Sequence, residues 1–263
     1  MPAFLDTIVA AHRAEAAGDS RDVDAALDEA RRAGPVRPFA GAIGQAADRD
    51  GVAVIAEIKR RSPSKGDLDP SLDPASVAHE YQSGGAACLS VLTDRDFFGG
   101  APDDLRAARG AVALPVLRKD FTVSALDVCD ARTMGADAVL LIVAALTDAE
   151  LAAFLAMARR CSLDALVEVH DELELKRALE AGADMIGVNQ RDLHTFEVDQ
   201  RRALGLGESI PSSVTAVAES GIGGPDDVRR LADHGYRAVL VGEHLVRSGD
   251  RSAAVAELLG TGP

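Results

Sequence analysis

The sequence lacks the features that would place a chain in a membrane or on the secretory route. No stretch of about 18 uncharged apolar residues occurs, so we expect no transmembrane helix and no membrane partner. Asp6, His12 and Arg13 put charges where a signal peptide would carry its apolar core, so we expect no such signal.

Cysteine is scarce, and its spacing excludes the usual cysteine sites. The chain has three cysteines, Cys88, Cys129 and Cys161, which are far apart and odd in number. They form neither a disulfide framework nor a CxxC metal or redox motif, and the six histidines add no ligand spacing. We therefore expect buried, inert thiols, a reducing cytoplasm, and no metal or cofactor.

Positively charged residues are also few relative to negatively charged ones. With 28 Lys and Arg against 42 Asp and Glu, the formal net charge is −14. Such a chain repels nucleic acid, and no basic cluster with interleaved aromatics offsets the repulsion, so no nucleic-acid partner is expected. An anionic substrate would have to be held by a local group of cations.

What the sequence does contain is a repeat. Segments around Gly85, Gly135, Gly182 and Gly235 each end a helical pattern in Gly and continue into an apolar strand. The runs "VAVIAEI", "LPVLRKD", "DALVEVH" and "VTAVAES" lie between them. Together they give about eight strands alternating with helices, the pattern of a parallel sheet with crossover helices.

This alternation predicts an α/β fold, a (β/α)8 TIM barrel, as a single domain over residues 1–263. Helix signals support it, such as the capping-box pair Thr147 and Glu150. The alternative, an open doubly wound sheet, would usually carry a Gly-rich turn after its first strand, where "KRRSPSKGD" stands instead. Residues 1–50 lie outside the repeat and predict a helical N-terminal extension, with helices around "FLDTIVAAH" and residues 22–32.

Polar residues mark the ends of most predicted strands. In such a barrel the chemistry lies at the carboxyl ends of the strands. We therefore expect these residues to converge on one mouth: Glu57, Lys59, Lys119, Glu168, Asn189, Arg191, Glu219, Ser220, Gly221, Gly242 and Glu243.

Glu57 and Lys59 stand two apart around Ile58, so their side chains share one face of a strand. They are either a solvated strand end or a pair directed into a site, and the convergence of charges favours a site. "SGIGG" and "GEH" open the loops after the last two strands, where barrels commonly bind phosphate through backbone N–H groups. The expected partner is a small, anionic, phosphorylated substrate.

Seven motifs resemble one known family. "VIAEIKRRSPSKG", "FFGG", "PVLRKDF", "LVEVHDE", "IGVNQRDLHTFEVD", "VAESGI" and "VLVGEHL" look like the indole-3-glycerol-phosphate synthases of tryptophan biosynthesis, in register from Phe39 onward. The resemblance implies a carboxy-lyase without a cofactor. It would close an indole ring on 1-(2-carboxyphenylamino)-1-deoxyribulose 5-phosphate, with release of carbon dioxide and water. It leaves open whether other enzymes of the pathway dock on it.

The resemblance also implies roles for individual residues. Lys119 matches the general acid of ring closure, a role that neighbours lowering its pKa would favour. Glu57, Lys59 and Glu168 match the other acid–base groups. The matches to substrate contacts are Ser62, Phe98, Phe121, Asn189 and Arg191, and those to the phosphate end are Ser220, Gly221, Gly242 and Glu243.

The chain departs from the family pattern at Ala101, Gln190 and His244, none of which replaces an acid–base group. Two other functions stay open. A sugar-phosphate isomerase resembling phosphoribosylanthranilate isomerase would need Cys and Asp at strand ends, whereas the first strand here ends in Glu-Ile-Lys. A non-catalytic barrel that binds a phosphorylated metabolite would not need the ionisable residues at the strand ends.

Overall fold

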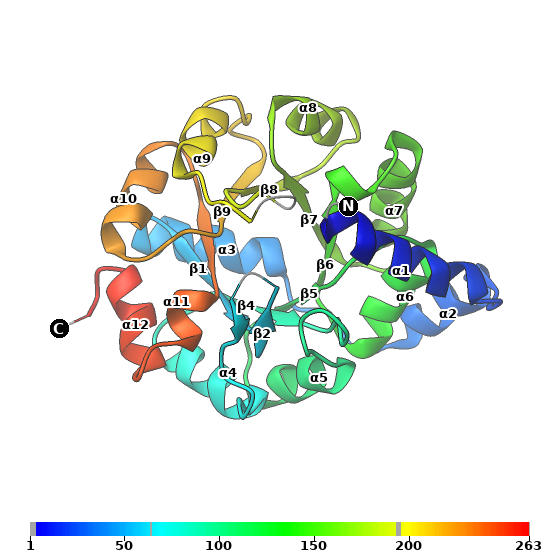
Figure 1. Ribbon diagram of the computed structural model, residues 1–263, viewed down its shortest axis with the longest axis horizontal. Helices are drawn as coiled ribbons and strands as arrows, with labels where there is room; N and C mark the ends of the chain where they lie inside the picture. Colours follow the sequence, from blue (N-terminus) through cyan, green and yellow to red (C-terminus); the bar gives the residue numbers. More distant parts are fainter. Residues whose placement is uncertain (1–3, 64, 193–195, 263) are drawn as a thin grey trace.

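The computed structural model describes residues 4–63, 65–192 and 196–262 and contains a closed barrel of parallel strands (Figure 1). The strands neighbour one another in the order β1-β10-β9-β8-β7-β6-β5-β4, and β4 pairs back with β1. Their bounds are Ala53–Ile58 (β1), Cys88–Leu92 (β4), Val116–Lys119 (β5), Ala138–Ile142 (β6), Asp164–Val169 (β7), Met185–Asn189 (β8), Thr215–Glu219 (β9) and Ala238–Val241 (β10). The predicted (β/α)8 barrel is confirmed.

Helices follow the strands and ring the outside of the barrel (Figure 1). They are α4 (Pro74–Ser83), α5 (Pro102–Ala111), α6 (Ala125–Met134), α7 (Asp148–Arg160), α8 (Glu172–Glu180), α9 (Gln200–Gly207), α10 (Pro225–Asp233), α11 (Glu243–Val246) and α12 (Arg251–Leu258). Thr147 and Glu150 form the predicted capping box of α7. The four repeat glycines all have positive φ, as expected for residues that end a helix. In the described ranges, no helix combines the length and the apolarity that a bilayer crossing requires.

Side chains alternate between the inside of the barrel and the helix layer, because successive residues of a strand point to opposite faces. On β1, Ala53 and Ile55 belong to the interior cluster, while Val54 and Ala56 pack in the layer under the helices. The same parity holds on β7, where Leu166 points inward and Val167 outward. The apolar interior therefore fills the barrel, and the next inward positions along each strand reach its carboxyl end.

In the described part of the chain, three helices precede the barrel: α1 (Phe4–Gly18), α2 (Val23–Arg32) and α3 (Phe39–Asp50). The first two are the predicted helices of the extension, and α2 packs on α6. The third was not predicted. Phe39 and Ile43 of α3 are fully buried against the interior cluster, and the Phe39 carbonyl accepts a hydrogen bond from Cys88 Sγ, near the start of β4. Helix α3 thus closes the amino-terminal end of the barrel.

Helix α1 reaches to the other end of the barrel, where the carboxyl ends of the strands open. His12 Nε2 lies 3.0 Å from Asp94 Oδ2, in the loop after β4, and 3.9 Å from Asp120 Oδ1, just after β5. Burial alone would lower the pKa of His12, but the hydrogen bond to Asp94 and the charge of Asp120 outweigh it and raise the pKa. Arg13 of the same helix forms a bidentate ion pair with Glu150 of α7.

We expect His12→Gln to destabilise the protein in acid and to leave it unchanged in alkali. A raised folded-state pKa contributes stability that is fully present below the unfolded pKa and is lost as pH rises through the folded pKa. Thermal melts should show a Tm lower by roughly 2–4 °C at pH values below about 6, the shift for about 1 kcal/mol in a chain of this size. His79→Gln, at an exposed histidine of α4, is the matched control. A Tm difference that stays constant with pH would rule out the ionic contact.

Candidate active site

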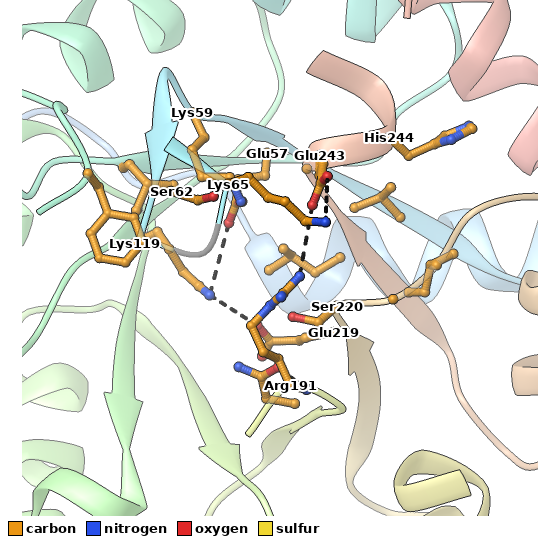
Figure 2. A pocket seen from close by; sticks show the side chains of 18 of the residues that line it. Glu57, Lys59, Ser62, Lys65, Lys119, Arg191, Glu219, Ser220, Glu243 and His244 are labelled. Atoms are coloured by element: carbon orange, nitrogen blue, oxygen red, sulfur yellow. Dashed lines mark hydrogen bonds and ion pairs between the residues drawn. The ribbon is translucent and has the colours of Figure 1, made fainter. Parts of the chain in front are cut away.

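A cavity of about 1130 Å³ opens at the carboxyl ends of the strands (Figure 2). Its size suits a small molecule of one ring and a phosphorylated chain. Every residue predicted for the site lines it: Glu57, Lys59, Ser62, Phe98, Lys119, Phe121, Glu168, Asn189, Arg191, Ser220, Gly221, Gly242 and Glu243. The structure therefore brings together residues from seven of the barrel strands and the loops that follow them.

Strand parity explains why the acidic and basic groups face one another. Lys119 follows the inward Leu117 by two residues, Glu168 follows Leu166, and Glu219 follows Val217. Glu57 stands in the same relation to Ile55. Each charged group is thus the next inward position above an apolar layer, at the last residue or two of its strand.

Lys119 is the centre of this group. Its Nζ lies 3.1 Å from Glu219 Oε2 and 4.0 Å from Glu57 Oε2 (Figure 2). It also lies 3.5 Å from Glu168 Oε2. Burial by itself would lower the pKa of Lys119, but the three carboxylates outweigh burial and raise the pKa. Its neighbours therefore do not lower this pKa, because three buried anions from β1, β7 and β9 surround the ammonium.

The three carboxyl groups differ in their surroundings. Burial raises the pKa of Glu219, whose Oε1 is buried without a hydrogen-bond partner among the described residues. That oxygen lies against Gly187 of β8, where even a methyl group would overlap it. Burial would also raise the pKa of Glu168, but Lys119 and His170 lower it. Glu219 is therefore the carboxyl group that holds a proton most readily, and Glu168 is the one kept ionised.

Glu57 and Lys59 form a close pair at the end of β1. Lys59 Nζ lies 2.5 Å from Glu57 Oε1, and their side chains are 16% and 6% exposed. Burial disfavours the charged form of Glu57, but Lys59 and Lys119 outweigh it and lower the pKa of Glu57. Gly242 leaves the space that the Glu57 carboxylate occupies. The pair points into the cavity, so the solvated strand end is excluded.

One wall of the cavity is aromatic. The rings of Phe98 and Phe121 lie 6.1 Å apart between centroids, tilted by 39°. Ser62 stands nearby on a short hairpin, β2 (Arg61–Ser62) paired with β3 (Gly66–Asp67), and its hydroxyl oxygen is buried without a partner in the described part of the chain. This wall offers flat apolar surface beside one hydroxyl group, which suits an aromatic ring carrying a polar substituent.

The opposite end is built from two turns. Ser220 and Gly221, after β9, both have positive φ, and Gln190 and Gln200 side chains hold their carbonyl groups at 2.7 Å. Beside them, Glu243 follows Gly242 after β10. Two cations lie near its carboxylate in Figure 2, Lys65 at 4.0 Å and Arg191 at 3.9 Å. A third, Arg247, lies at 3.6 Å. These cations supply the local positive charge that an acidic chain needs to hold an anion.

Comparison with known proteins agrees with this geometry. A family model for indole-3-glycerol phosphate synthase matches residues 5–258. An indole-3-glycerol phosphate synthase 2 of Streptomyces coelicolor is 52% identical over 231 residues, 88% of each chain. The indole-3-glycerol phosphate synthase of a Polaromonas species is 46% identical over 262 residues, 99% of each chain.

The chain belongs to the indole-3-glycerol phosphate synthase family. A solved 3-hexulose-6-phosphate synthase superposes with a TM-score of 0.63 at 18% identity, over 81% of this chain and 100% of that one. At that identity the likeness concerns the fold alone.

The sequence alone did not assign a role to several residues that line the cavity. Glu219 was recognised as a strand end, but its contact with Lys119 spans 100 residues of sequence. Lys65 and Arg247 contact Glu243 from two different loops. Of the three departures from the family pattern, Ala101 is the uncapped N-cap of α5, and Gln190 donates a hydrogen bond to the Ser220 carbonyl. His244 lines the cavity but points away from the Lys119 group (Figure 2).

The cysteines do not offer an isomerase-type acid–base group. Cys88, Cys129 and Cys161 are all buried, and none lines the cavity. Burial raises the pKa of each thiol, that of Cys129 to about 12. A catalytic thiol needs an accessible position and a depressed pKa. The geometry therefore favours the chemistry of the synthase family over that of an isomerase.

Proposed function

We propose that this cavity converts 1-(2-carboxyphenylamino)-1-deoxyribulose 5-phosphate into indole-3-glycerol phosphate, carbon dioxide and water, as a carboxy-lyase of tryptophan biosynthesis. One observation carries the proposal: a buried lysine, held by three carboxylates, stands between an aromatic wall and a cationic end. The substrate has matching parts in the same order, namely a carboxyphenyl ring, a ketone and a phosphate.

Lys119 is the general acid for ring closure. A new bond forms between the ring carbon that bears the carboxylate and the ketone carbon, and the carbonyl electrons move to oxygen, which takes a proton from Lys119. The raised pKa keeps Lys119 as an ammonium at neutral pH, so a proton is available for that oxygen. The carboxylates keep the ammonium at the reacting centre while no substrate is bound.

Decarboxylation and dehydration follow. The bond to the carboxylate breaks, carbon dioxide leaves, and its electron pair restores the aromatic ring. Lys59 is the cation that positions the carboxylate beforehand, with Glu57 holding Lys59 in place. Dehydration then needs a proton delivered to the leaving hydroxyl group and another removed from the neighbouring CH2 carbon of the new ring, so that the indole double bond forms. Glu168, kept ionised 3.5 Å from Lys119, is the base for that removal.

The remaining residues hold the substrate. Phe98 and Phe121 stack against the carboxyphenyl ring, and Ser62, Asn189 and Arg191 donate hydrogen bonds to its polar groups. Ser220, Gly221, Gly242 and Glu243 form the phosphate end, where backbone N–H groups of the two turns bind the phosphate oxygens.

The test of this function is incubation with the anilino-deoxyribulose phosphate and detection of indole-3-glycerol phosphate. Only indole formation builds a new indole chromophore, and because the chain has no tryptophan its own fluorescence does not mask the product. Appearance of indole absorbance and emission supports the proposal. Binding without product would favour the non-catalytic barrel.

We expect the phosphate to contribute most of the affinity. The substrate without its phosphate should bind much more weakly, because each charge-assisted hydrogen bond contributes about 1.5–3 kcal/mol. Inorganic phosphate should compete with the intact substrate and not with the dephosphorylated one. Competition measured by product fluorescence checks both statements. If inorganic phosphate does not compete, the phosphate binds elsewhere than at Gly221 and Gly242.

The domain organisation, location and partners of the chain are part of the proposal. We propose that residues 1–263 work as a single domain in the cytoplasm, on a phosphorylated small molecule, without metal or cofactor and without a nucleic-acid or membrane partner. Other enzymes of the tryptophan pathway are the candidate protein partners, because they make this substrate or consume this product.

A further inference from the structure

His170 lies directly behind Glu168, where β7 ends and α8 begins. It follows Glu168 by two residues and so continues the inward parity of the strand. Its Nε2 lies 3.5 Å from Glu168 Oε1, on the side of Glu168 away from the oxygen that contacts Lys119. The side chain is 11% exposed, and Nε2 is buried without a hydrogen-bond partner among the described residues.

Glu174 fixes the orientation of this ring. Its Oε2 accepts hydrogen bonds from the His170 backbone N–H at 2.8 Å and from Nδ1 at 3.0 Å. A carboxylate only accepts hydrogen bonds, so Nδ1 carries the hydrogen. Glu174 itself is held in the first turn of α8, where Asp171 caps its backbone N–H. The other ring nitrogen, Nε2, is thereby directed at Glu168.

The charge state of the ring follows from this placement. In neutral His170, Nε2 presents a lone pair to the negative oxygen of Glu168, which is unfavourable. In the imidazolium, Nε2 carries a hydrogen and faces that oxygen as an opposite charge. Burial alone would lower the pKa of His170, but Glu174 and Glu168 outweigh it and raise the pKa.

The other charged groups near the ring change this balance little. Arg202 of α9 opposes the positive charge on His170. It is itself engaged, 3.6 Å from Asp192 and 3.3 Å from the Asn189 carbonyl oxygen. Asp171 caps α8, and Lys119 acts on His170 only across Glu168. The two carboxylates that contact the ring therefore decide its charge.

We propose that His170, as an imidazolium, is a positioning residue that keeps Glu168 ionised and oriented for its role as the base. This inference rests on the proposed function, which assigns proton removal to Glu168. A contiguous line of charges results, from Glu174 through His170 and Glu168 to Lys119, with distances of 3.0, 3.5 and 3.5 Å. His170 contacts Glu168 from the protein side, so it acts through that residue and not on the substrate.

The first test measures the pKa of His170 by NMR titration of the ring resonances, without any substrate. His170→Gln assigns those resonances by their disappearance. Glu168→Gln should lower the His170 pKa by about one unit or more, the effect of losing an opposite charge at this distance. Glu174→Gln should lower it as well, while Glu172→Gln, an exposed acid on the same turn, should not. A His170 pKa unchanged in Glu168→Gln overturns the proposal.

The second test is the pH dependence of turnover. Coupling between two sites is reciprocal, so His170→Gln should move the acid limb of kcat and of kcat/KM upward by about one pH unit. A uniform loss at all pH values would indicate a structural role and overturn the proposal. Wild-type protein that makes no indole product would instead contradict the proposed function, and the NMR titration would still decide the His170–Glu168 contact.

Discussion

Turnover of Lys119→Ala should fall at least about 100-fold below wild type, the low end for loss of a general acid. Lys59, the other lysine that contacts Glu57, should not replace it, because Lys59 Nζ is held 2.5 Å from Oε1 of that carboxylate whereas Lys119 faces Oε2. Substrate affinity should fall less, since the aromatic wall and the phosphate end are untouched. Lys176→Ala, an exposed lysine on α8, is the matched control and should keep full turnover.

A stability measurement separates lost chemistry from lost structure. Without Lys119, Glu168 and Glu219 stay buried without the shared ammonium. The pKa of Glu168 should then rise above that of the unfolded chain, and the pKa of Glu219, which is already raised, should rise further. A raised carboxyl pKa contributes stability below the unfolded pKa of about 4.3 that is lost as pH rises through the folded pKa. Lys119→Ala should therefore melt close to wild type in acid and progressively below it toward neutral pH. Near-normal turnover at any pH would remove Lys119 from the mechanism.

The barrel could be predicted from sequence because its signals are local. A glycine that ends a helix, followed by an apolar strand, recurs at Gly85, Gly135, Gly182 and Gly235, and each has the positive φ that the pattern requires. Strand parity then gives the direction of each side chain at the carboxyl ends. For this reason Glu57, Lys119 and Glu168 could be assigned to one mouth before their distances were known.

What could not be predicted depends on contacts between distant segments. Helix α3 has few sequence signals of its own, and it is stabilised by burial of Phe39 and Ile43 under the barrel. The direction of the Lys119 pKa shift depends on Glu219, which is 100 residues away in sequence. The contact between His12 and Asp94 spans 82 residues. In each case the sequence contains the residue, but only the closed barrel determines its partner.

The pair at the end of β1 should behave as one unit in catalysis. Glu57→Gln and Lys59→Met should each reduce turnover by roughly 100-fold or more, as expected for groups that hold and position charge at the reacting centre. The double variant should be little worse than either single variant, because residues that act together fail together. The measurement is a double-mutant cycle on kcat, with product fluorescence as the readout.

Stability should respond to the two substitutions unequally, and this asymmetry is the control. Lys59→Met leaves the buried Glu57 carboxylate without its close partner, with Lys119 at 4.0 Å, and breaking a buried pair in this way costs about 3–5 kcal/mol. Glu57→Gln leaves Lys59, whose longer side chain is 16% exposed and can turn toward water, so its cost should be smaller. The double variant should melt above Lys59→Met alone, because no unpaired buried charge remains. Independent, additive losses of kcat would mean that Glu57 and Lys59 act separately, and full activity in the less stable Lys59→Met variant would leave the pair a purely structural role.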